Sequence, residues 1–231
     1  ASDPVFWESL RNNLLIAVVT VPASILLGVA MASFSNSLGK WGKTVTRIGF
    51  IYPTFIPLVA AANIWMFIYT PIYGLLGYIN SNWRLLADGK TAIWAIIVML
   101  IWKQAGYVMI FYISGLQNIN GELYEAANID GANAMQSFRH ITIPLISPTL
   151  FFVVMMRAMS ALKQFDTVYL LIKSNNPAYN RGMTLMTWFY REAFEKFDKG
   201  FGSVIVLYSF IIISIFTMIQ FLAEKKLVHY E

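Results

Sequence analysis

Three cationic side chains lie inside stretches of sequence that are otherwise apolar. Lys103 interrupts the run 92–116, and both Arg157 and Lys163 interrupt the run 148–172. A charge near the centre of a bilayer costs roughly 2.5–3.5 kcal/mol on insertion scales, so an ionisable residue at that depth is a functional candidate by default. The alternative is a structural role, in which the cation is paired or extends to the interface.

Polar and aromatic neighbours share helix faces with these cations. Helical spacing places Arg157, Ser160 and Gln164 on one face. The same spacing joins Lys103 to Tyr107. A surface of hydroxyl, amide and ring groups suits the hydroxyls and ring faces of a sugar. The residues that we expect along a solute path are Asn63, Lys103, Gln104, Tyr107, Arg157, Lys163 and Gln164.

Lys163 has a second explanation. Asp166 follows it by one helical turn, so the two side chains could neutralise one another. Pairing and solute contact carry equal weight for this lysine.

Several other chemistries are excluded by composition. The chain has no cysteine and two histidines, which argues against disulfides, thiolate metal sites and a histidine-built metal centre. His140 and His229 fall outside the apolar runs, and no nucleophile lies paired with a base. The sequence also lacks a Gly-x-x-x-x-Gly-Lys-Ser/Thr loop. We therefore expect no catalytic residue, no metal and no bound cofactor in this chain.

The overall composition is that of a membrane protein. Hydrophobic residues make up 58% of the 231 residues and charged residues only 13%, with a mean hydropathy of +0.59. A soluble domain carries roughly 25% charged residues. The net charge of +5 does not indicate nucleic-acid binding, because the basic residues are scattered and no run of five occurs.

The apolar residues collect into runs of about 20 residues or more, the length needed to cross ~30 Å of hydrocarbon. We place crossings at about 12–34, 48–70, 92–116, 148–172 and 201–223. Pro53 and Pro57 predict a kinked second crossing that is buried in protein. The segments 71–91 and 173–200 are too polar to span, and 183–197 has the pattern of an amphipathic helix on the outer surface. We expect an all-α polytopic protein with a single transmembrane domain, 1–231.

Charge counting does not orient these crossings, because basic residues flank both sides. Five crossings with a cytoplasmic C-terminus place the N-terminus outside. The chain begins with neither an initiator Met nor a secretory signal, so we expect that a preceding helix is missing from it.

The polar segment 117–147 has the pattern of a short helix, a glycine turn and a second helix. Small and apolar residues within 122–130 let the first helix pack closely, and Gly131 permits a backbone angle that strains other residues. Met135 and Phe138 can follow as docking side chains. A rigid protrusion of this kind can pass a nucleotide-driven movement from a soluble protein into membrane helices.

Two prolines follow this segment. Pro144 and Pro148 each lack a backbone N–H, so we expect them to end the protrusion where the fourth crossing begins.

The same segment resembles the EAA loop of binding-protein-dependent ABC importer permeases. That loop reads Glu-Ala-Ala, three residues, Gly, nine residues, Ile, one residue, Leu, Pro. The matching residues are Glu125, Ala126, Ala127, Gly131, Ile141 and Pro144, with Ile143 in place of the usual Leu. Alone, Glu125 would be a solvated residue favoured by ~0.3–1 kcal/mol near a helix N-terminus. Within the full motif we prefer a coupling role.

The resemblance extends into the carbohydrate-uptake branch of that family and covers nearly the whole chain. It is similar to the maltose-type first permease and to the glycerol-3-phosphate permease. The segments that carry this similarity are Trp102, Lys103 and Tyr107, then 115–117, 165–170, 190–194 and 200–203.

What the resemblance implies is a type I importer (MetI-like) permease fold of six core helices, five of them visible here. It implies a multi-pass protein of a bacterial or archaeal inner membrane, paired with a second related permease, two ATP-binding subunits that use ATP and Mg, and an extracytoplasmic solute-binding protein. The residues implied to dock on the ATPase are Glu125, Ala126, Ala127, Asp130, Gly131, Met135, Phe138 and Pro144.

The implied cargo is a di- or oligosaccharide, with glycerol 3-phosphate or a related polyol phosphate as the alternative. A different class, an ion-coupled secondary transporter, predicts carboxylates at mid-membrane. Only Asp166 approaches such a position, near a helix end.

Overall fold

The computed structural model describes residues 3–80, 82–174 and 176–227, and within these ranges the chain is helical, without a strand. The helices are α1 (Pro4–Ser37), α2 (Lys40–Phe55), α3 (Leu58–Tyr69), α4 (Leu75–Ile79), α5 (Gly89–Gln117), α6 (Gly121–Ile129), α7 (Ala134–Ser137), the π-helical turn η1 (Phe138–Thr142), α8 (Ile143–Leu162), α9 (Asp166–Leu171), α10 (Tyr179–Gly182), α11 (Leu185–Tyr190), the π-helical turn η2 (Arg191–Glu195) and α12 (Lys199–Leu227).

Four helical segments of the described chain are long and apolar enough to cross a membrane. They are Pro4–Ser37, Gly89–Gln117, Ala134–Leu162 and Lys199–Glu224. The pair α2 and α3 makes a fifth if the two count as one span, although a bend of 98° separates them. The all-α polytopic fold predicted from the sequence is thus confirmed.

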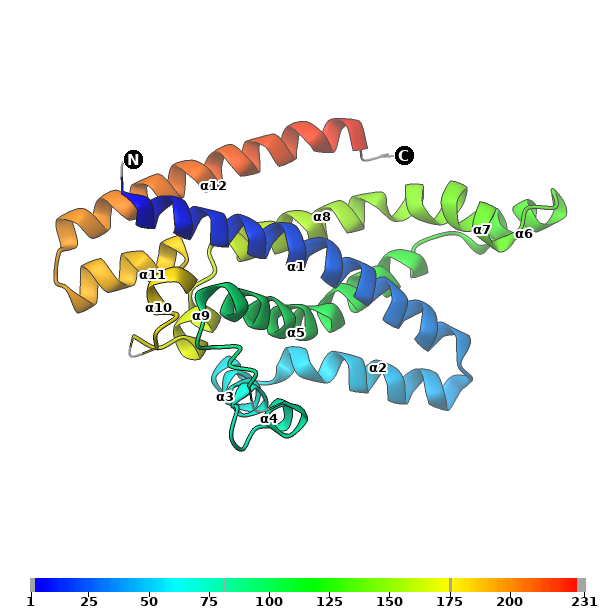
Figure 1. The fold of residues 1–231 in the computed structure, drawn as a ribbon. Helices are drawn as coiled ribbons and strands as arrows, with labels where there is room; N and C mark the ends of the chain where they lie inside the picture. The colour runs from blue at the N-terminus through cyan, green and yellow to red at the C-terminus, as the bar shows by residue number, and fades with distance from the viewer. Residues whose placement is uncertain (1–2, 81, 175, 228–231) are drawn as a thin grey trace.

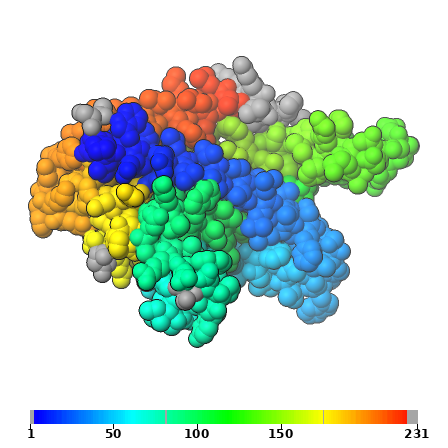
Figure 2. Space-filling view, in the orientation of Figure 1, coloured from blue at the N-terminus to red at the C-terminus, as the bar shows by residue number. Residues whose placement is uncertain are grey.

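The long helices alternate in direction. In Figure 1, α1, α5 and α12 run toward the end of the molecule at which α6 lies, whereas α2 and α8 run back. The short helices α9, α10 and α11 gather at the opposite end. In the space-filling view of Figure 2, the segment around α6 projects beyond the bundle as a narrow green arm.

Close packing of α1 and α2 on α5 holds the bundle together. A methyl group on Gly28 of α1 would come within 2.8 Å of the Val108 side chain, and one on Gly106 of α5 would overlap the Phe50 carbonyl of α2. Small residues let membrane helices approach in this way, which maximises their van der Waals contact. Ile16 and Ile96 lie fully buried in the resulting core.

The second predicted crossing, 48–70, is broken rather than gently kinked. Helix α2 ends at Phe55, Ile56 adopts an extended conformation, and α3 starts after Pro57. A residue that precedes proline is pushed out of the helical region, and proline itself has no N–H to donate. The two effects together end one helix and turn the chain by 98° before the next.

The helix at the fourth predicted crossing, 148–172, differs from that range at both ends. The helix begins at Ala134 and continues through Pro144, because η1 accommodates the proline with an i to i+5 hydrogen bond from Ile143 N–H to the Phe138 carbonyl. It ends at Leu162. The expectation that the prolines end the protrusion is therefore wrong.

The end of α8 removes the proposed pairing of Lys163 with Asp166. Lys163 is the exposed C-cap of α8, and Asp166 opens the separate helix α9. The two residues are not on consecutive turns of one helix, and among the described residues no ion pair joins them.

Candidate functional site

The turn after α6 has the geometry of a Schellman motif. The Ala132 N–H donates to the Ala127 carbonyl at 2.9 Å, and the Gly131 N–H donates to the Asn128 carbonyl at 3.1 Å. Gly131 adopts φ +79°, a left-handed conformation that glycine enters without the strain of a Cβ. The predicted helix, glycine turn and second helix are confirmed, with Gly131 at the position that requires a glycine.

Side chains fix both helices of this protrusion. The Asn120 side chain accepts from the Glu122 N–H at the start of α6, and Asn133 and Gln136 form a reciprocal capping box at the start of α7. The hydroxyls of Tyr124 and Thr142 lie 2.8 Å apart and connect α6 to η1. Because η1 continues directly into α8, the protrusion is joined without a flexible linker to a membrane helix.

The exposed surface of the protrusion carries large apolar side chains among polar ones. Ile129 is 86% exposed and Met135 is 71% exposed. Glu125, Ala126 and Asp130 are also exposed, whereas the remaining predicted docking residues Ala127, Phe138 and Pro144 are half-buried. A cleft of about 230 Å³ lies between the two helices and is lined by Ala127, Ala132, Gln136, Ser137, His140 and Ile141. An exposed apolar surface beside a cleft is typical of a docking site.

Lys103 lies at the break between α2 and α3. Its ammonium group donates to the carbonyls of Ile56 at 2.6 Å, Pro53 at 3.3 Å and Thr54 at 3.5 Å. The Thr54 hydroxyl donates in return to the Lys103 carbonyl at 3.1 Å. These carbonyls lose their helical donors at the break, and a cation with three N–H groups replaces them. This structural role accounts for a charge at this depth, and a role of Lys103 in the solute path stays a prediction.

Arg157 and Tyr107 are brought together from α8 and α5. The guanidinium carbon lies 4.6 Å from the centroid of the Tyr107 ring, within the range of a cation–π interaction. The ring of Tyr107 contacts Phe111, which contacts Phe152. Arg157 Nε is buried without a hydrogen-bond partner in the described part of the chain. The site therefore joins an aromatic surface to a guanidinium group that forms no ion pair within the described residues.

The other predicted path residues do not join this cluster through a hydrogen bond in the described chain. Gln164 donates to the Thr167 hydroxyl at 2.9 Å, and its carbonyl accepts from Thr184 at 2.6 Å. Asn63 is exposed and bonds to the Val59 carbonyl of its own helix. Gln104 is half-buried on α5.

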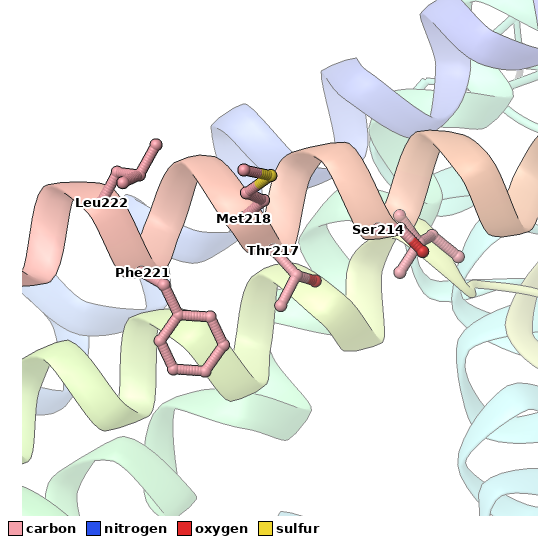
Figure 3. Close-up of a pocket in the computed structure, with 6 residues that line it drawn as sticks. Ser214, Thr217, Met218, Phe221 and Leu222 are labelled. Carbon is pink, nitrogen blue, oxygen red and sulfur yellow. The ribbon is translucent and has the colours of Figure 1, made fainter.

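A larger cavity along α12 does not suit a hydrophilic solute. It has a volume of about 490 Å³ and is lined by Ile213, Ser214, Thr217, Met218, Phe221 and Leu222 (Figure 3). Two hydroxyls are its only polar side chains, and the remaining side chains are apolar. Its composition fits lipid or a neighbouring helix rather than a solute path.

Two buried asparagines that sequence reasoning missed hold the segment 179–195, here called the cover, on the bundle. Asn13 donates to the carbonyls of Ala161 at 3.3 Å and Leu162 at 3.0 Å, and its side-chain oxygen accepts from the Leu185 N–H. Asn12 donates to the carbonyls of Arg181 and Met183, both at 2.8 Å. Two consecutive amides at the start of an apolar helix were the signal available in the sequence.

Glu192 is a second residue that sequence reasoning missed. Its buried carboxylate accepts from the Trp188 indole at 3.0 Å and pairs with Arg191 at 2.8 Å and Lys196 at 3.0 Å. Burial alone would raise its pKa, but the hydrogen bonds and charges of Arg191 and Lys196 outweigh burial and hold the pKa below its usual value.

Tyr179 lies next to this network. Burial first, and then the negative charge of Glu195, raise the pKa of Tyr179 to about 12. Its hydroxyl lies 3.4 Å from each oxygen of the Glu195 carboxylate, so a neutral donor is kept opposite a carboxylate. The hydrogen bonds and ion pairs of Glu192 and Tyr179 therefore connect different parts of the cover to one another.

Comparison with known proteins places this arrangement in a family. Residues 24–229 match the model of the binding-protein-dependent transport system inner membrane component family. A probable ABC transporter permease protein of Pyrococcus horikoshii is 36% identical over 214 residues, which are 88% of this chain and 71% of the relative. A trehalose/maltose transport system permease protein of Thermococcus litoralis is 31% identical over 221 residues, 93% of this chain and 73% of the relative.

A solved structure shares the fold. The chain superposes with a TM-score of 0.88 on a subunit of a bacterial ABC transporter involved in the import of the acidic polysaccharide alginate. The sequences are 21% identical, and the match covers 99% of this chain and 82% of the other. The family match decides against the alternative that the sequence had left open, an ion-coupled secondary transporter. The chain belongs to the binding-protein-dependent transport system inner membrane component family, as the membrane permease subunit of an ABC importer.

Proposed function

We propose that this permease carries a di- or oligosaccharide past the Arg157 and Tyr107 pair. The observation that carries the proposal is the guanidinium 4.6 Å from the tyrosine ring, with Arg157 Nε unpaired and further aromatic rings alongside. Aromatic faces suit the apolar faces of a sugar ring, and the guanidinium supplies hydrogen-bond donors for its hydroxyls. The similarity to a trehalose/maltose permease supports the same class of cargo.

The protrusion formed by α6 and α7 is the proposed contact with the ATPase. Its exposed apolar residues dock on an ATP-binding subunit, and the Schellman turn at Gly131 keeps the two short helices at a fixed angle. A displacement of α6 then reaches α8 through the Tyr124 contact and η1. Because Arg157 belongs to α8, movement at the protrusion changes the position of the solute site.

The complete importer in this proposal contains this chain, a second related permease, two ATPase subunits and an extracytoplasmic solute-binding protein. ATP and Mg bind to the ATPase, because this chain lacks a phosphate-binding loop. The protrusion is cytoplasmic in this proposal, and because α12 runs toward the end that carries α6, the last turn of α12 lies on the same side (Figure 1).

A polyol phosphate is the second candidate cargo. The Arg157 guanidinium, which forms no ion pair within the described residues, favours it, because an arginine binds phosphate through charge-assisted hydrogen bonds. Transport of a polyol phosphate should depend more strongly on the positive charge of Arg157 than transport of a neutral sugar.

The test is ligand-stimulated ATP hydrolysis by the assembled importer in proteoliposomes, with maltose, trehalose and glycerol 3-phosphate as probes. Arg157→Gln should lower the stimulated rate about tenfold or more, as expected for loss of a charged hydrogen bond, and should leave the basal rate unchanged. Lys173→Gln, at an exposed position, is the control. If a disaccharide stimulates Arg157→Gln as well as it stimulates the wild type, the assignment of Arg157 is wrong.

A further inference from the structure

A cavity of about 500 Å³ lies at the end of the molecule opposite to α6. Its walls come from the first turns of α1 and α5 and from the short helix α10. Its charged side chains are Glu8, Arg11, Lys90 and Arg181. Three cations and one carboxylate give the cavity an excess of two positive charges. No part of the coupling or transport proposal uses it.

Close contacts hold together the three helices that carry these cations. The buried Asn12 side chain donates to the Arg181 carbonyl at 2.8 Å and ties α10 to α1. Arg181 also packs against Gly89, where a methyl group on the glycine would overlap the Arg181 Cβ. Three elements distant in sequence are thus fixed around one space, and each contributes one cation to it.

The charged ends of these cations are available to a ligand. Within residues 3–80, 82–174 and 176–227, the side chains of Arg11, Lys90 and Arg181 form no ion pair or hydrogen bond. Several unpaired cations around one cavity repel one another, and an anion that enters the cavity relieves this repulsion.

The residues around the cavity have the distribution expected at the level of the lipid headgroups. Beyond Arg11, helix α1 carries no charged residue up to its end at Ser37, so the apolar part of the crossing starts at the cavity. Trp94 lines the cavity and is 51% exposed. Tryptophans gather at membrane–water interfaces, where an amphipathic ring contacts both headgroups and acyl chains. Leu15 and Ile93 add an apolar wall beside the charges.

We propose that this cavity binds the phosphate of an anionic phospholipid of the outer leaflet. The three cations contact the phosphodiester, and Leu15, Ile93 and Trp94 contact the upper acyl chains. The combination of charged and apolar walls favours a lipid over a free anion, which has nothing to place against the apolar wall. The inference does not depend on the cargo, because the cavity is separate from Arg157 and Tyr107.

The test measures lipid retained by the purified importer. The complex is placed in nanodiscs of zwitterionic POPE with a minor share of anionic POPG, released, and examined by native mass spectrometry. Arg181→Gln and Lys90→Gln should each weaken POPG binding about fivefold, the effect of one cation near an anionic surface. Glu8→Gln should strengthen it, because a repelling carboxylate is removed. Arg84→Gln, at an exposed position outside the cavity, is the control and should retain as much POPG as the wild type.

Three outcomes would overturn the proposal. One is equal retention of POPG by the wild type, Arg181→Gln and Glu8→Gln. Another is displacement of POPG by millimolar inorganic phosphate, which would make the cavity a site for the free anion. The third is unchanged lipid retention together with weaker association of the solute-binding protein, which would assign the cations to an acidic protein surface. None of these outcomes bears on the proposed cargo, which ligand-stimulated ATP hydrolysis tests separately.

Discussion

The ammonium group of Lys103 shows how one side chain can stabilise a broken membrane helix. Three carbonyls around the break at Ile56 and Pro57 are directed at it, the nearest at 2.6 Å. In a bilayer a carbonyl without a partner cannot turn to water, so the donor must come from the protein. The lysine therefore contributes to the fold even though its charge is costly at that depth.

Replacement of Lys103 by methionine should destabilise the permease. The change keeps an unbranched side chain that is one heavy atom shorter and removes its donors, which leaves carbonyls unsatisfied at a cost of about 1–3 kcal/mol. Thermal unfolding of the purified protein in detergent should move to lower temperature, and Lys103→Arg should recover part of the loss. Lys163→Met, at an exposed position, should stay close to wild type. Equal unfolding temperatures for both methionine variants would contradict the role given to Lys103.

Among the elements, the protrusion of α6 and α7 depends on local sequence more than any other part of the chain. Its caps, its Schellman turn and its capping box all use residues within five positions of one another. Short-range hydrogen bonds of this kind form wherever the right side chains stand at the right spacing. For this reason the helix, glycine turn and second helix could be predicted before any tertiary contact was known.

Substitution of Gly131 by alanine should impair coupling without unfolding the bundle. A Cβ at φ +79° costs about 1–2 kcal/mol, and no neighbouring atom lies within 4 Å to suffer a clash. The strain is relieved if the turn changes shape, which misaligns α6. Ligand-stimulated ATP hydrolysis should fall severalfold, whereas the thermal unfolding temperature should stay the same.

Gly121 offers a matched control for that experiment. It lies in α6 itself, has ordinary helical geometry, and a methyl group added there would also meet no atom within 4 Å. Gly121→Ala should therefore retain wild-type hydrolysis. Equal activity of the two alanine variants would mean that the left-handed turn is not needed for coupling.

On the scale of the whole molecule, the cover and the protrusion are stabilised in different ways. The protrusion is local, while the cover is tied to the bundle by Asn12 and Asn13 from the other end of the sequence. Glu192 adds a charged network within the cover itself. Protonation of the Glu192 carboxylate at low pH should therefore loosen the cover first and leave the protrusion intact.

Low pH should weaken the hydrogen bonds and ion pairs of Glu192 that stabilise the cover. The pKa of Glu192 is lower in the folded protein than in the unfolded chain, so its contribution to stability is fully present above the unfolded pKa. It is lost as the pH falls through the folded pKa, in a window that begins near the ordinary glutamate pKa of about 4.3 and extends below it. Hydrogen exchange of residues 179–195 should accelerate across that window.

The glutamine variant supplies the comparison. Glu192→Gln cannot lose a charge, so exchange in the cover should already be faster at neutral pH and should change little with acid. Asp166→Asn, at an exposed position, should keep the wild-type pH response. An identical pH response in wild type and Glu192→Gln would assign the acid sensitivity to another group.

The sequence by itself determined the class of this protein, the presence of long apolar helices and the two short helices joined by the Gly131 turn. Each of these depends on composition or on residues that are close in the chain, because runs of about 20 apolar residues and helix caps need no distant partner. The third crossing was placed almost at its observed bounds, Gly89–Gln117, for the same reason.

Only the tertiary structure decided where α8 ends, what Lys103 binds and which ring lies beside Arg157. Asn13 binds the last carbonyls of α8 from about 150 positions away, and Lys103 finds its acceptors on another helix. The cavity formed by Arg11, Lys90 and Arg181 likewise exists only because α1, α5 and α10 meet. Apolar periodicity shows that a segment crosses the membrane, but contacts between distant segments decide where it stops and which charges it brings together.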